Sequence, residues 1–377
     1  MFDQRGELPL LPFGNPIGFV PASRGGVYIE SSMKAVRIHA HGGLDVLRYE
    51  EVERPRLTSP TDAIVQLKTA ALNRIDLWNR QGLTGLDIAL PHILGADGAG
   101  IVVETGEEVH NVKPGDPVCL YPPSGCGRCE FCSTDREFLC INLRVPGERL
   151  QGTYAEYVKI PAGNCFPVPA GLSFEEAAAF PLVFLTVWRM LVTNAELKPG
   201  EHVLILGIGG GVATAALQLA KQMGAHVVVT SSSDEKLEMA KSWGADHGIN
   251  YLKSDFTKEV RALTAKRGVD VVVDSVGGES WVKSLAALAK GGRLVTCGAT
   301  AGANPPTDIR RIFWNHLKIF GSTLGSRGEF RQLLSFMQVN GVRPIVDQVF
   351  PLQETAAAQC RLEEGKQFGK VVLQIAD

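Results

Sequence analysis

A glycine-rich turn near the middle of the chain joins a buried-strand pattern to a helical pattern. The apolar run Val203–Leu206 leads into Gly-Ile-Gly-Gly-Gly-Val-Ala at 207–213, and apolar residues at helical spacing follow over 215–223. Glycines let the backbone approach an anion, and the N–H groups and dipole of the next helix bind phosphate. The spacing is Gly207-x-x-Gly210-x-x-Ala213 instead of G-x-G-x-x-G, so a tight structural turn is the alternative.

Strand and helix patterns alternate around this turn, which predicts right-handed βαβ crossovers and a parallel sheet. The expected strands are 201–207, 226–231, 269–275 and 293–298, and the expected helices are 212–223, 234–243 and 280–289. Earlier in the chain, glycine and proline turns separate short strands expected at 62–70, 98–105, 116–121 and 153–160. The sequence therefore predicts an α/β protein with a doubly wound parallel sheet and a second, mostly-β domain.

The charge balance and the apolar runs exclude several classes of protein. Lys and Arg number 38 against 40 Asp and Glu, with no block of like charge, which argues against nucleic acid or an anionic membrane as the main partner. The longest apolar run, 177–188, is too short to span a bilayer. Charged residues at positions 3, 5 and 7 do not suit a signal peptide, so we expect a cytoplasmic protein.

Residues 1–32 differ from the rest of the chain. They hold four prolines and five glycines and show neither helical nor strand periodicity. We expect a flexible extension or an upstream translation start, and an arm that packs on a partner subunit is the alternative.

Four of the eight cysteines lie within fifteen residues, at Cys126, Cys129, Cys132 and Cys140. Four thiolates at this spacing can surround a tetrahedral Zn²⁺ and leave no position for water or substrate, so the site is structural. A disulfide pair and inert buried thiols are the alternatives, and a reducing compartment disfavours disulfides. The sequence predicts one structural Zn²⁺ per chain.

The strand after the glycine turn ends in serines where an NAD site has an acidic residue. Hydroxyls at Ser231 and Ser232, with Lys236 one helical turn later, suit a 2′-phosphate, which a carboxylate would repel. Asp234 lies past the strand end and is expected to start the next helix. The alternative is that Ser233 only caps that helix and Lys236 is a solvated charge. We expect NADP(H) in preference to NAD(H).

From Met33 onward the chain resembles the medium-chain dehydrogenase/reductase superfamily, which includes zinc alcohol dehydrogenases and quinone oxidoreductases. The motifs that carry the resemblance are the cysteine cluster, the glycine turn and the segments at 95–103, 152–157, 274–278 and 369–373. The resemblance implies a GroES-like domain from 33–175 and 326–377, with a zinc lobe at 122–145. It also implies a Rossmann domain at 176–325 and an active site in the cleft between the two. We expect a homodimer or homotetramer.

The departures from the family pattern concern its catalytic zinc. The positions of the family's Cys and His ligands hold Asn73 and Ala96, followed by Asp97, and the segment 180–186 offers neither Cys nor His. One carboxylate cannot hold zinc alone. We therefore predict a branch that keeps the structural zinc and has lost the catalytic one.

Loss of that Lewis acid restricts the chemistry, because hydride transfer to a simple ketone places negative charge on oxygen. A quinone or an α,β-unsaturated carbonyl spreads the charge, so a hydrogen-bond donor suffices. The segment from Asn73 to Gly82 resembles quinone oxidoreductases and enoyl reductases, with Trp78 where those enzymes often carry Tyr. We expect Asn73 to position nicotinamide or substrate and Trp78 to shape the pocket. Asp76 and Arg80 are expected to pair structurally.

The remaining site predictions follow from the resemblance. Water, His92 or Asp97 is expected to supply the proton. Thr186 is expected near the nicotinamide and Tyr251 beside the adenine ribose, with loop packing as the alternative for each. The other expected cofactor contacts are Gly207, Gly209, Gly210, Gly211 and Val212 at the turn, and Gly298, Ala299, Thr323 and Leu324 on the nicotinamide side.

The sequence therefore predicts an NADPH-dependent reductase of quinones or activated C=C bonds that acts on a small molecule. One alternative is an alcohol or ketone dehydrogenase that rebuilds its electrophile from Asp97 and a neighbour. The other alternative is an NADPH-binding sensor without turnover.

Overall fold

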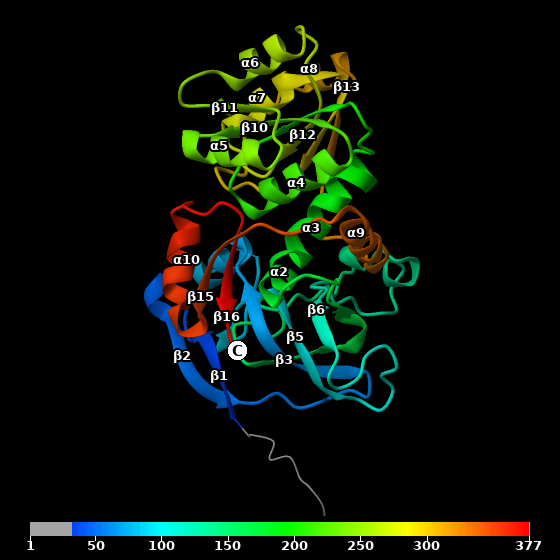
Figure 1. Cartoon of the computed structure of the whole chain (residues 1–377), viewed down its shortest axis with the longest axis vertical. Helices are drawn as coiled ribbons and strands as arrows, with labels where there is room; N and C mark the ends of the chain where they lie inside the picture. Colours follow the sequence, from blue (N-terminus) through cyan, green and yellow to red (C-terminus); the bar gives the residue numbers. More distant parts are fainter. Residues whose placement is uncertain (1–31, 84, 377) are drawn as a thin grey trace, which may run out of the picture. The chain divides into compact units, whose positions relative to one another are not determined.

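A six-stranded parallel sheet is formed by strands before and after the glycine turn in the computed structural model, which describes residues 32–83 and 85–376 (Figure 1). The predicted extension 1–32 thus lies outside the described residues, except for Ser32. The strands are β9 (His202–Ile205), β10 (His226–Ser231), β11 (His247–Asn250), β12 (Val269–Asp274), β13 (Leu288–Thr296) and β14 (Lys318–Gly321), in the order β11-β10-β9-β12-β13-β14. Chain order reverses beside β9, and in open parallel sheets ligands bind where it reverses, at the carboxyl ends of the strands.

The helices of this sheet complete the alternation. They are α4 (Gly211–Gln222), α5 (Asp234–Ser242), α6 (Phe256–Leu263), α7 (Ser280–Ala287) and α8 (Ile309–Trp314). The helix expected at 280–289 ends earlier because Leu288 is already extended, at φ −69° and ψ 143°, and begins β13. The predicted parallel sheet is confirmed.

A seven-stranded sheet brings together the two ends of the described chain. Its strands are β3 (Asp62–Ala71), β5 (Asp97–Thr105), β6 (Pro117–Leu120), β7 (Tyr157–Pro161), β8 (Cys165–Pro167), β15 (Val346–Pro351) and β16 (Lys370–Gln374). The late strand β16 pairs antiparallel with β3, with Val372 opposite Ala71. The predicted mostly-β part is confirmed, and it draws on residues from both ends of the sequence.

Within the described residues the fold also has a smaller sheet and five further α-helices, besides short 3₁₀ helices and a π-helix over Arg189–Asn194. The sheet has the order β2-β1-β4, from β1 (Ser32–Ile38), β2 (Leu47–Glu53) and β4 (His92–Ile93). The helices are α1 (Arg74–Gln81), α2 (Phe174–Ala179), α3 (Pro181–Trp188), α9 (Arg327–Asn340) and α10 (Thr355–Glu363). The strand expected at 153–160 begins only at Tyr157, because the N–H groups of 152–154 bond to 93–95 instead of to β3. None of the described helices combines the length and apolar character needed to cross a bilayer.

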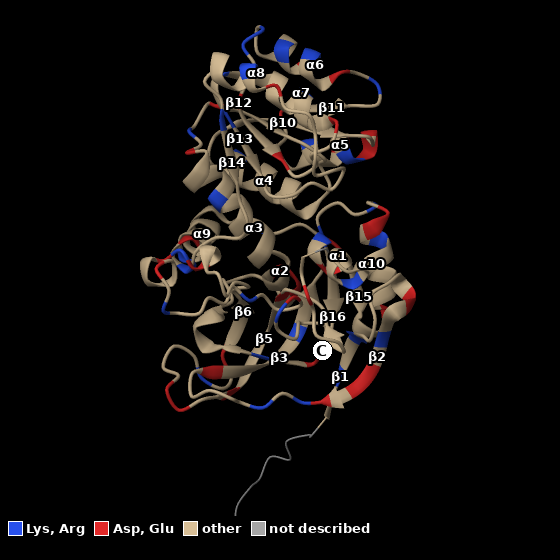
Figure 2. Cartoon of the chain, turned by 180° about the vertical axis from the view of Figure 1, so that it is seen from behind, with Lys and Arg blue, Asp and Glu red and all other residues tan. Residues whose placement is uncertain are grey.

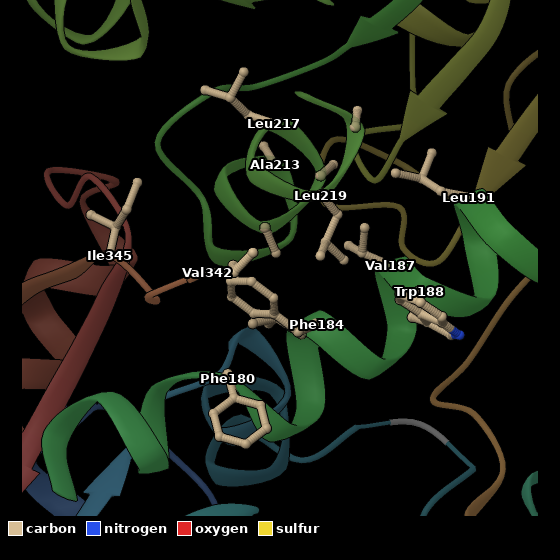
Figure 3. Packing of buried hydrophobic residues seen from close by; sticks show 14 of the residues in the cluster. Phe180, Phe184, Val187, Trp188, Leu191, Ala213, Leu217, Leu219, Val342 and Ile345 are labelled. Carbon is tan, nitrogen blue, oxygen red and sulfur yellow. The ribbon is translucent and has the colours of Figure 1, made fainter. Parts of the chain in front are cut away.

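The largest core cluster is built around α3 and α4 (Figure 3). Phe184 and Val187 of α3 point toward Leu219 of α4, and all three are buried. Phe180 stacks on Phe330 of α9 with ring centroids 5.8 Å apart. Each fully buried side chain of this size contributes about 1.5–3 kcal/mol to stability, so α3 is firmly held between α4 and α9.

Candidate active site

The glycine turn between β9 and α4 is shaped to accept an anion. Gly207 and Gly209 have φ of +68° and +113°, a region that L side chains rarely adopt. A Cβ added at Gly210 would meet only the Gly207 carbonyl oxygen within 4 Å, at 3.8 Å, so this face of the turn is open. The Thr214 N–H bonds to the Gly210 carbonyl at 2.9 Å, so the N–H groups of the preceding helical residues, including Gly211 and Val212, remain for a ligand. The turn therefore fits the pyrophosphate of a dinucleotide.

Two lysine side chains lie against this turn. A Cβ added at Gly209 would lie 3.1 Å from Lys236 Nζ, and one at Gly211 would lie 3.0 Å from Lys370 Cδ. The Lys236 ammonium donates to the Gly365 carbonyl, and partial burial lowers its pKa. The Lys236 ammonium beside free N–H groups favours a phosphate ligand electrostatically, whereas Lys370 passes the turn with its methylene groups.

The predicted ribose contacts lie together at the ends of β10 and β11. The Tyr251 N–H donates to the Ser231 carbonyl at 3.1 Å, and Asn250 Nδ2 donates to the Ser232 carbonyl at 3.2 Å. Ser233 also caps α5, since its hydroxyl accepts from the Lys236 N–H at 3.3 Å. The structure thus brings Ser231, Ser232 and Tyr251 together and turns the Lys236 ammonium toward the glycine turn.

The predicted nicotinamide contacts follow neighbouring strands. Gly298 and Ala299 follow β13, and Thr323 and Leu324 follow β14, which pairs parallel with β13. Their loops therefore leave the same edge of the sheet as the glycine turn. A Cβ at Gly325 would lie 2.7 Å from Leu185 Cδ1, so the loop after β14 passes against α3 beside Thr186. The Thr186 hydroxyl itself donates to the Leu182 carbonyl at 2.8 Å.

A buried polar cluster joins Asn73, Asp97 and Lys370. Lys370 Nζ donates to Asn73 Oδ1 at 2.6 Å and to Asp97 Oδ2 at 3.1 Å, and Asn73 Nδ2 donates to Asp97 Oδ2 at 2.9 Å. The Leu182 N–H donates to Asp97 Oδ1 at 2.9 Å, which ties the cluster to α3. Burial raises the pKa of Asp97, whose side chain is fully buried, while the Lys370 ammonium opposes that rise.

Lys370 is the site residue that sequence reasoning missed. It belongs to the segment Gly369-Lys-Val-Val-Leu373, whose sequence indicates the family and gives Lys370 no role in the site. The Gly369 N–H donates to the Gly209 carbonyl at 3.0 Å, so this segment reaches the glycine turn directly. The side chain runs past Gly211 to the Asn73 cluster and so links the turn to the residues predicted to be catalytic.

The expected pairing of Asp76 with Arg80 is wrong. Asp76 Oδ2 accepts from the Asn73 N–H and from the Tyr154 hydroxyl, both at 2.8 Å, and burial raises the pKa of Asp76 to about 7. Arg80 instead donates to Gln359 at 2.7 Å and pairs with Glu363, both on α10. Helical spacing permits an Asp76–Arg80 ion pair, but each side chain bonds instead to a residue outside α1.

The other two predicted catalytic residues lie outside the bonds of this cluster. His92 is buried on β4, where burial lowers its pKa and the nearby backbone groups of Gly147 and Ala89 oppose that shift. Its Nε2 has no partner among the described residues. Trp78 is half-buried on α1. The structure therefore joins Asn73 to Asp97 and holds His92 by a separate set of contacts.

The cysteine cluster has the geometry of a closed metal site. The Sγ atoms of its four residues all lie within 4.8 Å of one another, and none of these cysteines forms a disulfide. Zn–S bonds of about 2.3 Å in a tetrahedron place sulfur atoms about 3.8 Å apart, so small adjustments suffice to hold Zn²⁺. Within 32–83 and 85–376 it is the only group of three or more His, Cys, Asp or Glu side chains that could hold a metal.

Comparisons with known proteins agree with this architecture. The sequence matches the family "Alcohol dehydrogenase GroES-like domain" over 59–170 and "Zinc-binding dehydrogenase" over 211–339. A zinc-type alcohol dehydrogenase-like protein of Schizosaccharomyces pombe is 37% identical over 88% of this chain and 96% of its own length. An NAD-dependent alcohol dehydrogenase of Sulfurisphaera tokodaii is 32% identical over 90% of this chain and 99% of its own. A solved NAD-dependent alcohol dehydrogenase superposes with a TM-score of 0.88 at 43% identity, covering 91% of this chain and all of that one.

Proposed function

Because the chain belongs to the zinc-type alcohol dehydrogenase-like proteins of the medium-chain dehydrogenase/reductase superfamily, we propose that it is an NADP(H)-dependent reductase of quinones or α,β-unsaturated carbonyl compounds. Its relatives are named as alcohol dehydrogenases or alcohol dehydrogenase-like proteins, a class of oxidoreductase, and the family implies a nicotinamide cofactor and zinc. The observation that carries the finer proposal is the bonding of the Lys370 ammonium to Asn73 and Asp97.

This bonding supports a site that works without catalytic zinc. The Lys370 ammonium bonds the Asn73 amide and the Asp97 carboxylate, which lie at or beside the positions of the family's catalytic-zinc ligands. A divalent cation would have to displace that ammonium, and the neighbouring Ala96 is a buried methyl group that offers no ligand atom. We therefore propose one zinc per chain, held by Cys126, Cys129, Cys132 and Cys140.

In the proposed reaction the protein mainly binds the cofactor and orients it against the substrate. When bound, the reduced nicotinamide supplies a hydride. The glycine turn and the first turn of α4 would hold the pyrophosphate, and the Lys236 ammonium would contact the 2′-phosphate. Asn73 would orient the nicotinamide or substrate at the edge of the buried cluster. Water would supply the proton, because both Asp97 oxygens are already bonded and the His92 contacts lie elsewhere.

The preference for a 2′-phosphate is supported by the charges near Ser231 and Ser232. The nearest acidic side chain, Asp234, is paired with Lys253 at 2.5 Å and accepts from Asn250 at 2.8 Å. Its charge is therefore compensated, which leaves serine hydroxyls and nearby cations for a phosphate.

An alcohol or ketone dehydrogenase is the second candidate, favoured by the names of the relatives. In that case Asp97 and Lys370 together would form the electrophilic site. A cofactor-binding sensor without turnover is the third candidate. NADPH oxidation measured with a quinone, an enone, an enoyl thioester and a simple ketone separates the three. Turnover only of the ketone favours the dehydrogenase, and binding without turnover of any compound favours the sensor.

We also propose that the protein acts on a small molecule in the cytoplasm as a homodimer or homotetramer. Acidic and basic residues are interspersed along the ribbon (Figure 2), which does not suit a nucleic-acid surface. Within the described residues the edge strand β14 pairs only with β13, and the helix α8 that precedes it exposes Ile309, Phe313 and Trp314. Exposed apolar side chains beside an open sheet edge support association between copies of the chain.

A further inference from the structure

The segment between Cys132 and Cys140 reaches from the metal site to the beginning of α9. Asp135 Oδ2 accepts from Ser326 Oγ at 3.0 Å, and Asp135 Oδ1 accepts from the Gly328 N–H at 3.3 Å. Glu137 Oε1 accepts from the Arg327 N–H at 2.7 Å. Three consecutive residues of α9 and its cap are therefore bonded to two carboxylates from the cysteine lobe.

Packing strengthens this junction. The Tyr121 hydroxyl lies 2.8 Å from both Glu137 Oε1 and the Gly325 carbonyl oxygen, so its single proton bonds one of them at a time. A Cβ at Gly328 would lie 2.2 Å from Asp135 Oδ2, which shows how closely the carboxylate approaches the backbone. Phe138, the next residue of the lobe, carries the Arg189 guanidinium 3.7 Å above its ring.

The loop that this junction holds is the one between β14 and α9, at 322–325. Leu324 has φ +54°, a conformation that an L residue keeps only where its surroundings impose it. The Ser322 hydroxyl in the same loop is buried and has no partner among the described residues. A strained residue next to an unpartnered buried hydroxyl suits a loop that is completed by a ligand.

We propose that Asp135 and Glu137 are positioning residues that fix the loop 322–325 and thereby set the affinity for the nicotinamide half of the cofactor. The inference rests on the proposed function, in which Thr323 and Leu324 line the nicotinamide. A filled Cys₄ site holds Cys132 and Cys140 at fixed positions, and the two carboxylates pass that constraint to Ser326 and Arg327. The adenosine half binds at the ends of β9 and β10 and does not depend on this junction.

The test compares two ligands on the zinc-loaded protein. Calorimetry gives the Kd of NADPH and the Kd of 2′-phospho-ADP-ribose, which lacks the nicotinamide. Asp135→Ala and Glu137→Ala are each expected to weaken NADPH about tenfold, because each removes the charge-assisted contacts of one carboxylate, and to leave the affinity for the fragment unchanged. Glu137→Gln keeps an acceptor for the Arg327 N–H and should restore most of the affinity. Glu130→Ala removes an exposed acid from the same lobe and is the control.

A second variant avoids damage to the lobe. Gly328→Ala adds a methyl group that collides with the Asp135 carboxylate, yet alanine favours the helix in which it stands. It should reproduce the selective loss of NADPH affinity with zinc content and unfolding midpoint retained.

The possible outcomes separate this inference from the proposed function. Equal weakening of both ligands, or no weakening of either, in Gly328→Ala and in zinc-loaded Asp135→Ala overturns the positioning role. If the unmodified protein prefers NADH, NADH and ADP-ribose replace the two ligands. If it binds no nicotinamide dinucleotide at all, the proposed function fails and the inference falls with it.

Discussion

The Lys370 ammonium donates to Asn73 Oδ1 at 2.6 Å, although the two residues lie 297 positions apart in the sequence. The same ammonium is the buried counter-charge of Asp97, at 3.1 Å, with 4% of the Lys370 side chain and none of the Asp97 side chain exposed. The Lys370 ammonium therefore links the predicted catalytic residues Asn73 and Asp97 to β16, the strand that begins beside the glycine turn.

Lys370→Met is expected to lower the free energy of unfolding by about 3 kcal/mol, because it leaves the Asp97 carboxylate buried without a counter-charge. Urea denaturation at pH 7 measures the change. Lys370→Met combined with Asp97→Asn should recover much of the loss, since the double variant buries no unpaired charge. A single variant as stable as the parent would contradict the assigned ion pair.

Lys236→Ala is expected to weaken NADPH about tenfold and to leave NADH nearly unchanged, because the ammonium contributes one charge-assisted contact to the extra phosphate. Fluorescence titration with both cofactors measures the two affinities. Lys241→Ala, a change on the same helix at an ammonium paired with Glu238, is the matched control. Equal losses for both cofactors would refute the role in recognising the 2′-phosphate.

Metal analysis is expected to give one zinc per chain. Cys132→Ser should remove that zinc and lower the unfolding midpoint by at least ~5 °C, because zinc binds only the folded arrangement of the four thiolates and so stabilises the folded state. Cys360→Ser makes the same change at a cysteine on α10 and should leave both quantities unaffected. Two zincs per chain in the parent protein would contradict the proposal of a lost catalytic site.

Asp76 is expected to make stability fall as pH rises. Burial raises its pKa in the folded protein to about 7, above the value of about 3.9 for an unfolded chain. Between those values the folded state binds the extra proton, so this group's contribution is complete below pH 4 and is lost as pH rises through 7. The slope is at most about 1.4 kcal/mol per pH unit. Urea denaturation at pH 5, 6.5 and 8 should show a smaller decline in Asp76→Asn, and parallel curves would reject the assignment.

Trp314→Glu is expected to weaken the proposed association between copies of the chain and to lower the mass in solution, because it places a charge in the exposed apolar surface of α8 beside β14. Light scattering after size exclusion measures the mass. Val339→Glu makes the same kind of change at an exposed position of α9 and should leave the mass unaltered. A Trp314→Glu protein that keeps its full mass would place the interface elsewhere.

Local patterns in the sequence were enough to predict much of the fold. The run from Val203 to Ala213 predicted a strand, a turn and a helix, because apolar periodicity and glycine are read over a few residues. The Cys₄ spacing predicted the close approach of four sulfur atoms for the same reason. The strands β11 and β14 and the helices α6 and α8 were not predicted, since each spans eight residues or fewer and gives only a short pattern.

Contacts between distant segments could not be predicted in the same way. The Tyr154 hydroxyl, 78 residues away in the sequence, donates to the Asp76 carboxylate, and Arg80 donates to Gln359 of α10. Helical spacing between Asp76 and Arg80 therefore predicted the wrong pair. Lys370 was missed because its role depends on the pairing of β16 with β3, which no local pattern specifies.

The pairing of β16 with β3 also has a consequence for synthesis on the ribosome. Asn73 emerges 297 residues before Lys370, which at about 5–20 residues per second is roughly 15–60 s. Throughout that interval the nascent chain holds Asp97 without its counter-charge and β3 without one of its neighbours. Completion of the Asn73–Asp97–Lys370 cluster is therefore among the last events of translation, and a chain released before β16 would lack both the sheet strand and the cation.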